Sequence, residues 1–287
     1  MRPLRTLLAL GGVLGAYSTL VEPRSFRLQH HRLTVRSGLP GLRVLHLGDT
    51  HVRGPREPVL DFLRSLPALL GKEPDLVVVT GDLIDGDGGI DGAVEALDGL
   101  PARLGRFFVL GSHDYWAPEF ESYLKYFTGR KERIRPKHVD TARLRSGLEG
   151  SGWIELTNRY HVVSDGDTEI RLSGVDDPYL GRDDIAGVRR GDEGLAIGVM
   201  HAPDLVSDWA LRGYDLILAG HTHGGQVRVP FVGALTTNSS LPNRLAAGPT
   251  RVGEAWLHVT PGLGTGPYSR IRFNCPPEAT LLELAPA

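Results

Sequence analysis

The sequence predicts an α/β (α+β) fold in which two packed mixed β-sheets are flanked by helices. Short runs rich in leucine and valine recur from residue 42 onward, and each run stops abruptly at glycine, aspartate or histidine. Segments with a helical spacing of apolar residues lie between several of these runs. A further group of short strand candidates, in the middle and at the end of the chain, predicts the second sheet.

Five apolar runs are predicted to be buried strands that end in polar side chains, at 42–47, 76–80, 107–110, 195–200 and 216–219. Helices are predicted at 59–70, 92–100 and 204–211, and the strands of the second sheet at 153–156, 160–163, 169–172, 255–259 and 279–284. Ligands collect at the carboxyl ends of strands in a sheet that helices cover. The five strand ends are therefore expected to converge on one edge. Because no repeat or Ser/Gly linker divides the chain, residues 40–287 are predicted to form one domain.

Composition excludes several classes of protein. The 287 residues carry 32 Lys+Arg and 34 Asp+Glu, which gives a net charge of -2. With this balance no overall field attracts nucleic acid, and no nucleic-acid partner is expected. The single cysteine, Cys275, cannot close an intramolecular disulfide, so a disulfide-stapled secreted scaffold is excluded.

The amino terminus, residues 1–25, is predicted to be a hydrophobic anchor or signal segment. Arg2 and Arg5 precede an apolar stretch at 7–21, whose length suits a signal peptide or a marginal membrane anchor. A helix that belongs to the soluble fold is the third alternative. Because arginines downstream of the stretch outnumber the two upstream, a retained anchor would leave the main domain on the cytoplasmic face of a membrane. Export of the domain is the alternative location.

The side chains that follow the five predicted strands are typical of a metal site. They are Asp49 and His51, then Asp82 and Asp85, His113, His201, and finally His221 and His223. Aspartate and histidine without nearby cysteine suit Mn, Fe or Zn. The set exceeds what one tetrahedral ion needs, which favours two divalent metal ions that share a carboxylate. Two such ions can hold a hydroxide between them and stabilise charge on a phosphoryl group, so the pattern predicts phosphoester hydrolysis.

The order of the motifs resembles that of the calcineurin-like metallophosphoesterases. Asp-x-His, Gly-Asp-x-x-Asp, Gly-x-His-Asp, a lone His and Gly-His-x-His follow one another between residues 42 and 226. The stretch Gly-His-Thr-His-Gly-Gly-Gln-Val-Arg at 220–228, behind a basic and apolar amino terminus, is similar to the membrane-associated branch that includes UDP-2,3-diacylglucosamine hydrolase-like proteins. The resemblance implies a four-layer sandwich and a metal-dependent phosphoesterase or pyrophosphatase, whose substrate could be lipid- or nucleotide-linked and lie at a membrane.

Carried over position by position, the resemblance implies a role for each motif residue. Asp49, His51 and His223 would bind one metal, His201 and His221 would bind the other, and Asp82 would bridge the two. His113 would not be a ligand but would donate a proton or hydrogen bond to the substrate, and Asp85 would orient the His113 ring. The family usually has asparagine as a ligand of the second metal where this chain has Ser112. Serine is a poorer ligand, so the alternative function is a non-catalytic or weakly active regulatory protein with a degraded second site.

Three further expectations concern other residues. Arg228 and Arg272 are candidates for contacts with the substrate phosphate. The segment 115–145, in which aromatic and basic residues alternate, could overhang the metals or form an amphipathic helix. The remaining histidines are assigned to hydrogen-bonded or solvent-facing structural positions: His30, His31, His46, His138, His161 and His258.

Overall fold

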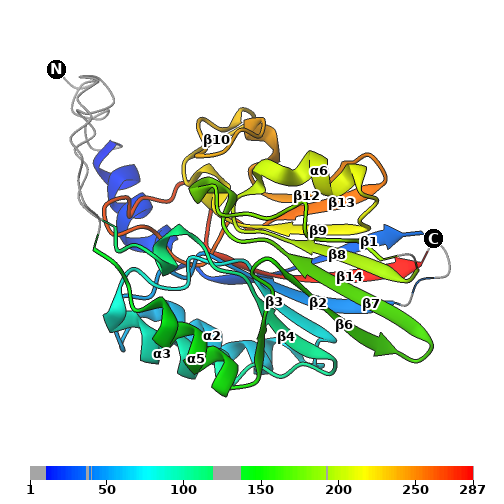
Figure 1. The fold of residues 1–287 in the computed structure, drawn as a ribbon. Coiled ribbons are helices and arrows are strands. Elements are labelled where there is room, and N and C mark those ends of the chain that lie inside the picture. The colour runs from blue at the N-terminus through cyan, green and yellow to red at the C-terminus, as the bar shows by residue number, and fades with distance from the viewer. Residues whose placement is uncertain (1–10, 37–38, 40, 119–136, 192, 287) are drawn as a thin grey trace.

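The chain folds as two mixed β-sheets packed face to face, with helices on their outer faces (Figure 1). The structure is a computed structural model that describes residues 11–36, 39, 41–118, 137–191 and 193–286. Most of the segment 115–145, from residue 119 to 136, and residues 1–10 of the predicted anchor lie outside the described residues. The predicted fold class is confirmed.

The first sheet has the strand order β1-β14-β2-β3-β4-β5. Its strands are β1 (Arg27–Val35), β14 (Glu278–Pro286), β2 (Leu42–Leu47), β3 (Leu76–Val79), β4 (Gly105–Phe108) and β5 (Trp153–Glu155). Strands β2 to β5 are parallel, β14 runs antiparallel to β2, and β1 pairs in parallel with β14. Strands β2 and β3 are almost continuously buried and apolar, as expected for strands covered on both faces.

The second sheet has the order β12-β13-β9-β8-β7-β6. Its strands are β12 (Gly248–Val252), β13 (Ala255–Val259), β9 (Leu216–Ala219), β8 (Leu195–Val199), β7 (Thr168–Gly174) and β6 (Arg159–Asp165). The four central strands are parallel, and an antiparallel strand closes each edge. A short hairpin of β10 (Arg228–Val229) and β11 (Gly233–Ala234) stands apart from both sheets.

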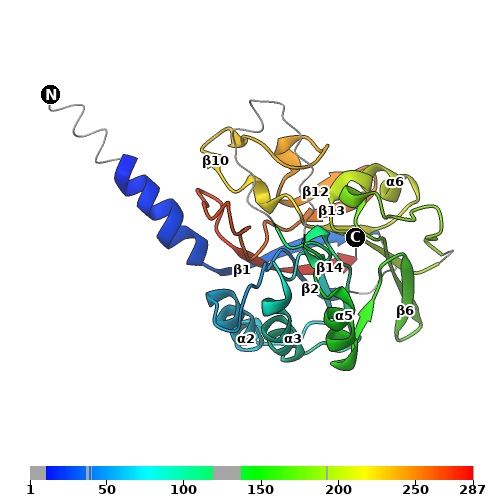
Figure 2. The same ribbon diagram turned by 60° about the vertical axis from the view of Figure 1, so that its left-hand side comes forward.

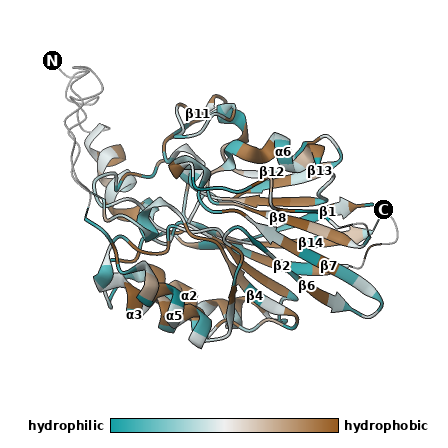
Figure 3. Cartoon of the chain, in the orientation of Figure 1, coloured by the Kyte–Doolittle hydropathy of each residue, from teal (hydrophilic) through white to brown (hydrophobic). Residues whose placement is uncertain are grey.

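Helices complete the outer layers. Helices α2 (Pro58–Leu70), α3 (Ile90–Asp98) and α5 (Thr141–Gly150) cover the first sheet, and α6 (Val206–Leu211) covers the second (Figure 1). Three buried apolar clusters fill the spaces between the four layers, and hydrophobic residues run along the strands of both sheets (Figure 3). Burial of apolar surface in three stacked layers is the main stabilising term. It fixes the two sheets relative to each other.

Two expectations about the sheets were wrong. The five strands that end in ligands do not share one sheet, because β2, β3 and β4 lie in the first sheet while β8 and β9 lie in the second. Strands β5 and β14, which we expected in the second sheet, extend the first. Short strands buried on both faces carry the same apolar pattern in either sheet, so their sequence does not determine their partner.

The predicted start of the domain at residue 40 is too late, because β1 precedes it. Among its residues only Leu33 and Val35 are buried, and arginines and histidines occupy most other positions. This alternation is typical of an edge strand that faces solvent on one side. Leu33 and Val35 pack in the apolar cluster between the sheets, which makes β1 part of the core.

The described part of the amino-terminal segment is a helical arm that leads away from the body (Figure 2). Its base is fixed to the fold, since the Arg272 amide donates to the Ser18 carbonyl and the Cys275 amide donates to the buried Glu22 carboxylate. Further out, Val13, Leu20 and other apolar side chains are exposed. Within the described residues, no helix combines the length and apolar character needed to cross a bilayer.

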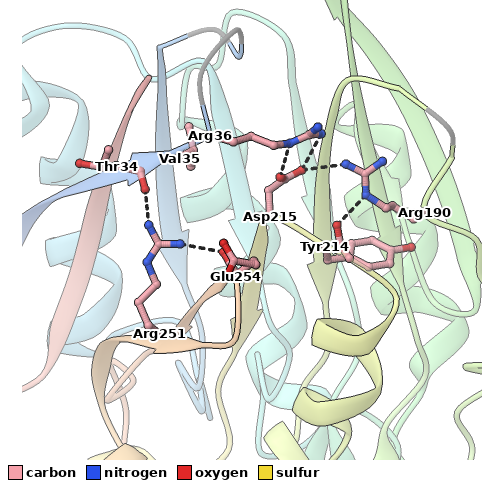
Figure 4. A pocket seen from close by; sticks show the side chains of 9 residues that line it. Thr34, Val35, Arg36, Arg190, Tyr214, Asp215, Arg251 and Glu254 are labelled. Carbon is pink, nitrogen blue, oxygen red and sulfur yellow. Dashed lines mark hydrogen bonds and ion pairs between the residues drawn. The ribbon is translucent and has the colours of Figure 1, made fainter. Parts of the chain in front are cut away.

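A polar junction joins the sheets at the amino end of β9, opposite the end that carries His221. Arg36, which follows β1, forms a 2.7 Å ion pair with Asp215, and Arg190 contacts the same carboxylate (Figure 4). Arg251 donates to the Thr34 carbonyl at 2.6 Å. These arginines border a cavity of about 520 Å³, but protein acceptors engage their guanidinium groups. The junction is structural.

Candidate metal centre

The ligand side chains of both sheets meet where the carboxyl ends of β2, β3, β8 and β9 come together. Short turns with left-handed backbone present them: Asp49 (φ 50°), His51 (47°), Asp82 (50°), His221 (69°) and His223 (49°) all have positive φ. Positive φ is uncommon for residues other than glycine, and such strain concentrates at functional sites. The shared conformation turns each side chain away from its strand toward the common centre.

A first group of ligands consists of Asp49, His51 and His223, whose ligand atoms lie within 4.8 Å of one another. The Nε2 atoms of His51 and His223 are 3.0 Å apart. The Nδ1 atom of His51 lies 2.7 Å from the carboxylate of Asp85, and since a carboxylate can only accept, this nitrogen carries the proton. The Nε2 atom of His51 therefore presents a lone pair to the centre of the group.

A second group consists of Asp82, His201 and His221, all buried. The Nδ1 of His201 donates to the Thr80 carbonyl at 2.7 Å, and the Nε2 of His221 donates to the Asn238 carbonyl at 3.1 Å. Carbonyls only accept, so the remaining nitrogen of each ring is unprotonated in the neutral side chains. These two nitrogens face each other at 3.2 Å. Two lone pairs at this distance repel each other unless a metal ion or a shared proton lies between them, and the donor set fits a metal ion.

Asp82 lies between the two groups. Its Oδ2 atom is 3.3 Å from His201 Nε2 and 3.8 Å from His51 Nε2. The other oxygen, Oδ1, accepts a hydrogen bond from the His113 amide at 2.8 Å, which fixes the orientation of the carboxylate. One carboxylate within reach of both groups is the arrangement that a shared ligand needs.

The electrostatics of the centre favour positive charge. Burial alone would raise the pKa of Asp82, but His201, His113 and His51 hold it well below its usual value. Burial lowers the pKa of His201, yet the carboxylate of Asp82 more than compensates and holds it well above its usual value. Burial and the neighbouring His201 lower the pKa of His221 to about 4, which keeps that ring in the neutral form that binds metals.

His113 lies beside the two groups in a short turn, Ser112–Asp114, and its side chain is 26% exposed. Its Nδ1 is 2.7 Å from Asp85 Oδ1, the oxygen that His51 also contacts. Burial disfavours the charged ring, but Asp82 and Asp85 raise the pKa of His113 to about 9. His51 and His113 in turn hold the pKa of Asp85 far below its usual value, although burial opposes its ionisation. Asp85 thus contacts a candidate ligand as well as the candidate proton donor.

Ser112 follows Gly111, which packs directly against the second group. A methyl group on Gly111 would overlap Asp82 Oδ1 and lie 2.7 Å from His201 Cε1. Ser112 therefore follows directly on a residue that packs against this group. No other described residue forms a hydrogen bond with its hydroxyl, so the lone pairs of this oxygen are available for a ligand.

The two arginines predicted to contact substrate do not line the cavity that the ligand histidines border. Arg272 is completely buried, and its guanidinium donates to the carbonyls of Pro261, Gly262, Gly264 and Cys275. The structure contradicts a direct substrate contact for Arg272, because backbone acceptors surround its charge. Arg228 donates to the Gly224 carbonyl and lines a different cavity from the one that the ligand histidines border.

Two residues near the centre were missed. Arg53, two positions after His51, donates to Asp85 at 2.9 Å, and its proximity to the Asp-x-His motif was the available signal. Asp177, just before a short helix, is buried, and its Oδ2 has no hydrogen-bond partner among the described residues. Burial raises the pKa of Asp177 to about 6. The charge of His201 opposes this increase, and the charge of Asp82 adds to it.

The centre opens to solvent through a cavity of about 510 Å³. Its lining includes His51, His113, His221 and His223, together with the segment 236–238 and the residues Gly266 and Ser269. A smaller cavity of about 190 Å³ reaches His51 from the other side and is bordered by Arg24, Arg53 and Arg270. A substrate phosphate can therefore reach both ligand groups and His113.

Comparison with known proteins places this geometry in a family. Residues 42–225 match the model of the calcineurin-like phosphoesterases. The chain is 26% identical to the metallophosphoesterase YkuE of Bacillus subtilis (strain 168), over 96% of this chain and 91% of that protein. It is 28% identical to the phosphodiesterase YaeI of Escherichia coli (strain K12), over 93% and 92% of the two chains. A transmembrane protein with metallophosphoesterase domain from Bos taurus is 30% identical, and the match covers 90% of this chain and 55% of that protein.

The family match spans all five strand ends and every ligand of the two groups. It agrees with the resemblance that the motifs indicate. The chain therefore belongs to the calcineurin-like phosphoesterases, a family of metal-dependent hydrolases.

Proposed function

We propose that this hydrolase cleaves phosphodiester bonds with two divalent cations, one at each ligand group. The convergence of His201, His221 and the Asp82 carboxylate carries the proposal, since two imidazole nitrogens 3.2 Å apart beside a carboxylate form a ligand set for a divalent cation. The aspartate and imidazole donors suit Mn, Fe or Zn. When bound, two such ions would supply an activated water and offset the charge of the phosphoryl group.

The protein's own side chains would position the reaction. Asp82 would contribute a ligand to each of the two groups. The amide of His113 donates a hydrogen bond that fixes the orientation of the Asp82 carboxylate. The His113 ring, which lines the cavity, would donate a hydrogen bond or proton to the leaving oxygen. Asp85 would keep that ring aligned, and would do the same for His51. The alternative function, a non-catalytic or weakly active regulatory protein, rests on Ser112 alone. The other candidate ligands all lie in the two groups.

We further propose that the substrate is a phosphodiester presented at a lipid surface. Exposed apolar side chains lie close in sequence to residues that line the cavity: Phe231 in the turn between β10 and β11, Leu235 next to the lining residue Thr236, and Tyr268 next to the lining residue Ser269. The arm at residues 11–21 exposes further apolar side chains. Apolar side chains beside a polar site are typical of contact with the membrane interface.

Charge and relatives support this placement. Arg24 and Arg270 border the smaller cavity beside His51, where they would attract anionic headgroups. A relative from Bos taurus is named a transmembrane protein, and the Escherichia coli relative is named a phosphodiesterase. The arginines that follow the amino-terminal segment favour attachment at the cytoplasmic face.

Hydrolysis of two aryl phosphates tests the reaction. The chelator-treated protein should be inactive, and Mn²⁺ should restore hydrolysis of bis(p-nitrophenyl) phosphate in preference to p-nitrophenyl phosphate. No hydrolysis with Mn²⁺, Fe²⁺ or Zn²⁺ would contradict the proposal and favour the regulatory alternative.

Sedimentation with vesicles of phosphatidylcholine and phosphatidylglycerol tests the lipid surface. Phe231→Asp should weaken vesicle binding by about tenfold or more, because it removes a large apolar side chain and adds a negative charge. Hydrolysis of the soluble diester should not change. Leu211→Asp, at an exposed leucine on α6, is the matched control and should bind vesicles as the wild type does. Equal binding of all three proteins would rule out hairpin contact.

Ser112→Asn should tighten binding of the second cation. The amide oxygen of asparagine is a better neutral ligand than a hydroxyl and extends further from the backbone. In a titration of hydrolysis with Mn²⁺, the midpoint should move to lower concentration, while the rates of the two proteins should converge at saturation, since tighter binding does not lower the barrier of a filled site. An unchanged midpoint would show that position 112 does not contact metal.

A further inference from the structure

A second cluster of metal-binding side chains lies between the two sheets, away from the catalytic centre. His31 on β1, His258 on β13 and Glu278 at the start of β14 offer ligand atoms within 4.8 Å of one another. None of them belongs to the motifs at 42–225 that define the family. We expected both histidines to be structural, and their juxtaposition depends on β1, which sequence patterns did not predict.

The His258 side chain is completely buried, and its Nε2 atom has no hydrogen-bond partner among the described residues. A buried polar atom without a partner costs free energy and is uncommon in folded proteins. One ring nitrogen of His258 belongs to the same ligand cluster as His31 and Glu278. A cation at the centre of this cluster would satisfy it.

The other nitrogen of His258 is held in the way that a metal ligand needs. His258 Nδ1 lies 2.7 Å from His46 Nδ1, and His46 Nε2 lies 3.2 Å from the Thr80 hydroxyl. That hydroxyl can donate to the Leu47 carbonyl at 3.2 Å. If His258 Nδ1 carries a proton, every donor in this chain has an acceptor, and His258 Nε2 is left with a lone pair. Ligand histidines commonly donate their second nitrogen to a buried acceptor in this manner.

Glu278 and His31 supply the other two donors. Arg27 donates twice to Oε2 of Glu278, and the Thr280 hydroxyl donates to Oε1, which holds the carboxylate in place and leaves lone pairs on Oε1. His31 is half-buried and lines a cavity of about 420 Å³ together with Glu278. The cavity gives an ion access from solvent and room for a coordinated water.

We propose that His31, His258 and Glu278 bind a third divalent cation, of the zinc class. Two imidazoles and one carboxylate with a water in the fourth position form a common zinc ligand set. The three residues come from β1, β13 and β14, so the ion would link the edge strand of the first sheet to the second sheet. The site would fasten β1, and with it the amino-terminal arm, to the body of the protein.

Zinc stoichiometry tests the proposal. After equilibration with Zn²⁺ and dialysis, His31→Ala should hold one zinc fewer per chain than the wild type, as measured by elemental analysis. His30→Ala, at the neighbouring residue of β1 that faces solvent, is the matched control and should keep the wild-type number. Hydrolysis of bis(p-nitrophenyl) phosphate by His31→Ala should be unchanged, which would show that the variant is folded and its catalytic metals are present.

A variant with an impaired catalytic centre separates zinc binding at this cluster from metal binding at that centre. Asp82→Asn should still bind one zinc, and that zinc should raise its melting temperature, because an ion that binds only the folded state stabilises it. The double variants Asp82→Asn/His31→Ala and Asp82→Asn/Glu278→Gln should lose both the bound zinc and the shift. The same zinc content in wild type and His31→Ala, or an undiminished shift in both double variants, would overturn the proposal.

Discussion

Asp82→Asn is expected to remove more bound metal and more activity than any other single substitution in this protein. The Asp82 carboxylate lies 3.3 Å from His201 and 3.8 Å from His51, so it serves both ligand groups. Its negative charge would offset the repulsion between two cations, and asparagine has no such charge. We expect kcat/KM for the aryl diester to fall roughly 10³-fold or more, as when a principal charge-stabilising group is removed.

The measurement is elemental analysis of metal at the catalytic groups together with diester hydrolysis. Asp61→Asn, at an exposed aspartate on α2, removes the same charge elsewhere and should retain the metal content and the rate of the wild type. Circular dichroism should be similar for both variants. Two tightly bound ions at the catalytic groups of Asp82→Asn would show that Asp82 does not bridge them.

The candidate ligands could be singled out in the sequence because each follows a buried apolar run. Asp49 and His51 after β2, Asp82 after β3 and His221 after β9 stand at points where strand periodicity stops. Parallel strands of one sheet direct their carboxyl ends the same way, so the side chains after β2 and β3 had to be neighbours. That His221 joins them depends on the packing of the second sheet against the first. Their positive φ angles could not be predicted, because they depend on the packing of one turn against another.

Contacts between the two sheets could not be derived from the pattern. His46 on β2 and His258 on β13 are 212 residues apart, yet their ring nitrogens are 2.7 Å apart because the sheets pack face to face. Each histidine alone has the pattern of an isolated polar residue in an apolar strand. The partner of His31 was equally hidden, since β1 alternates polar and apolar residues too weakly to be recognised as a strand.

The positive charge of an arginine in the sequence did not predict whether its side chain lies near the substrate cavity. Arg272 and Arg53 are equally cationic in the sequence, but the chain folds backbone carbonyls around Arg272 and leaves Arg53 beside Asp85. Burial of an arginine depends on which loop closes over it, here the loop at 261–264. The position of a cation relative to a strand end, as for Arg53, is the more informative signal.

His113→Ala should keep the metals and lose rate, which is the second large effect that we expect. The ring is anchored by Asp85 at 2.7 Å and lines the main cavity, while both ligand groups are complete without it. Loss of a group that acts in proton transfer costs roughly 10²- to 10⁴-fold in rate. The loss should depend on the leaving group, since an aryloxide leaves without much protonation whereas an alkoxide needs a proton.

The measurement compares kcat for bis(p-nitrophenyl) phosphate with kcat for a diester whose leaving group is an aliphatic alcohol, in the wild type, His113→Ala and His221→Ala. If His113 protonates the leaving oxygen, its removal should lower the rate with the aliphatic diester far more than with the aryl diester. An equal loss with both substrates would assign His113 to binding of the phosphoryl oxygens instead. His221→Ala should lose metal and reduce both rates together, so metal loss of similar extent in His113→Ala would identify His113 as a ligand.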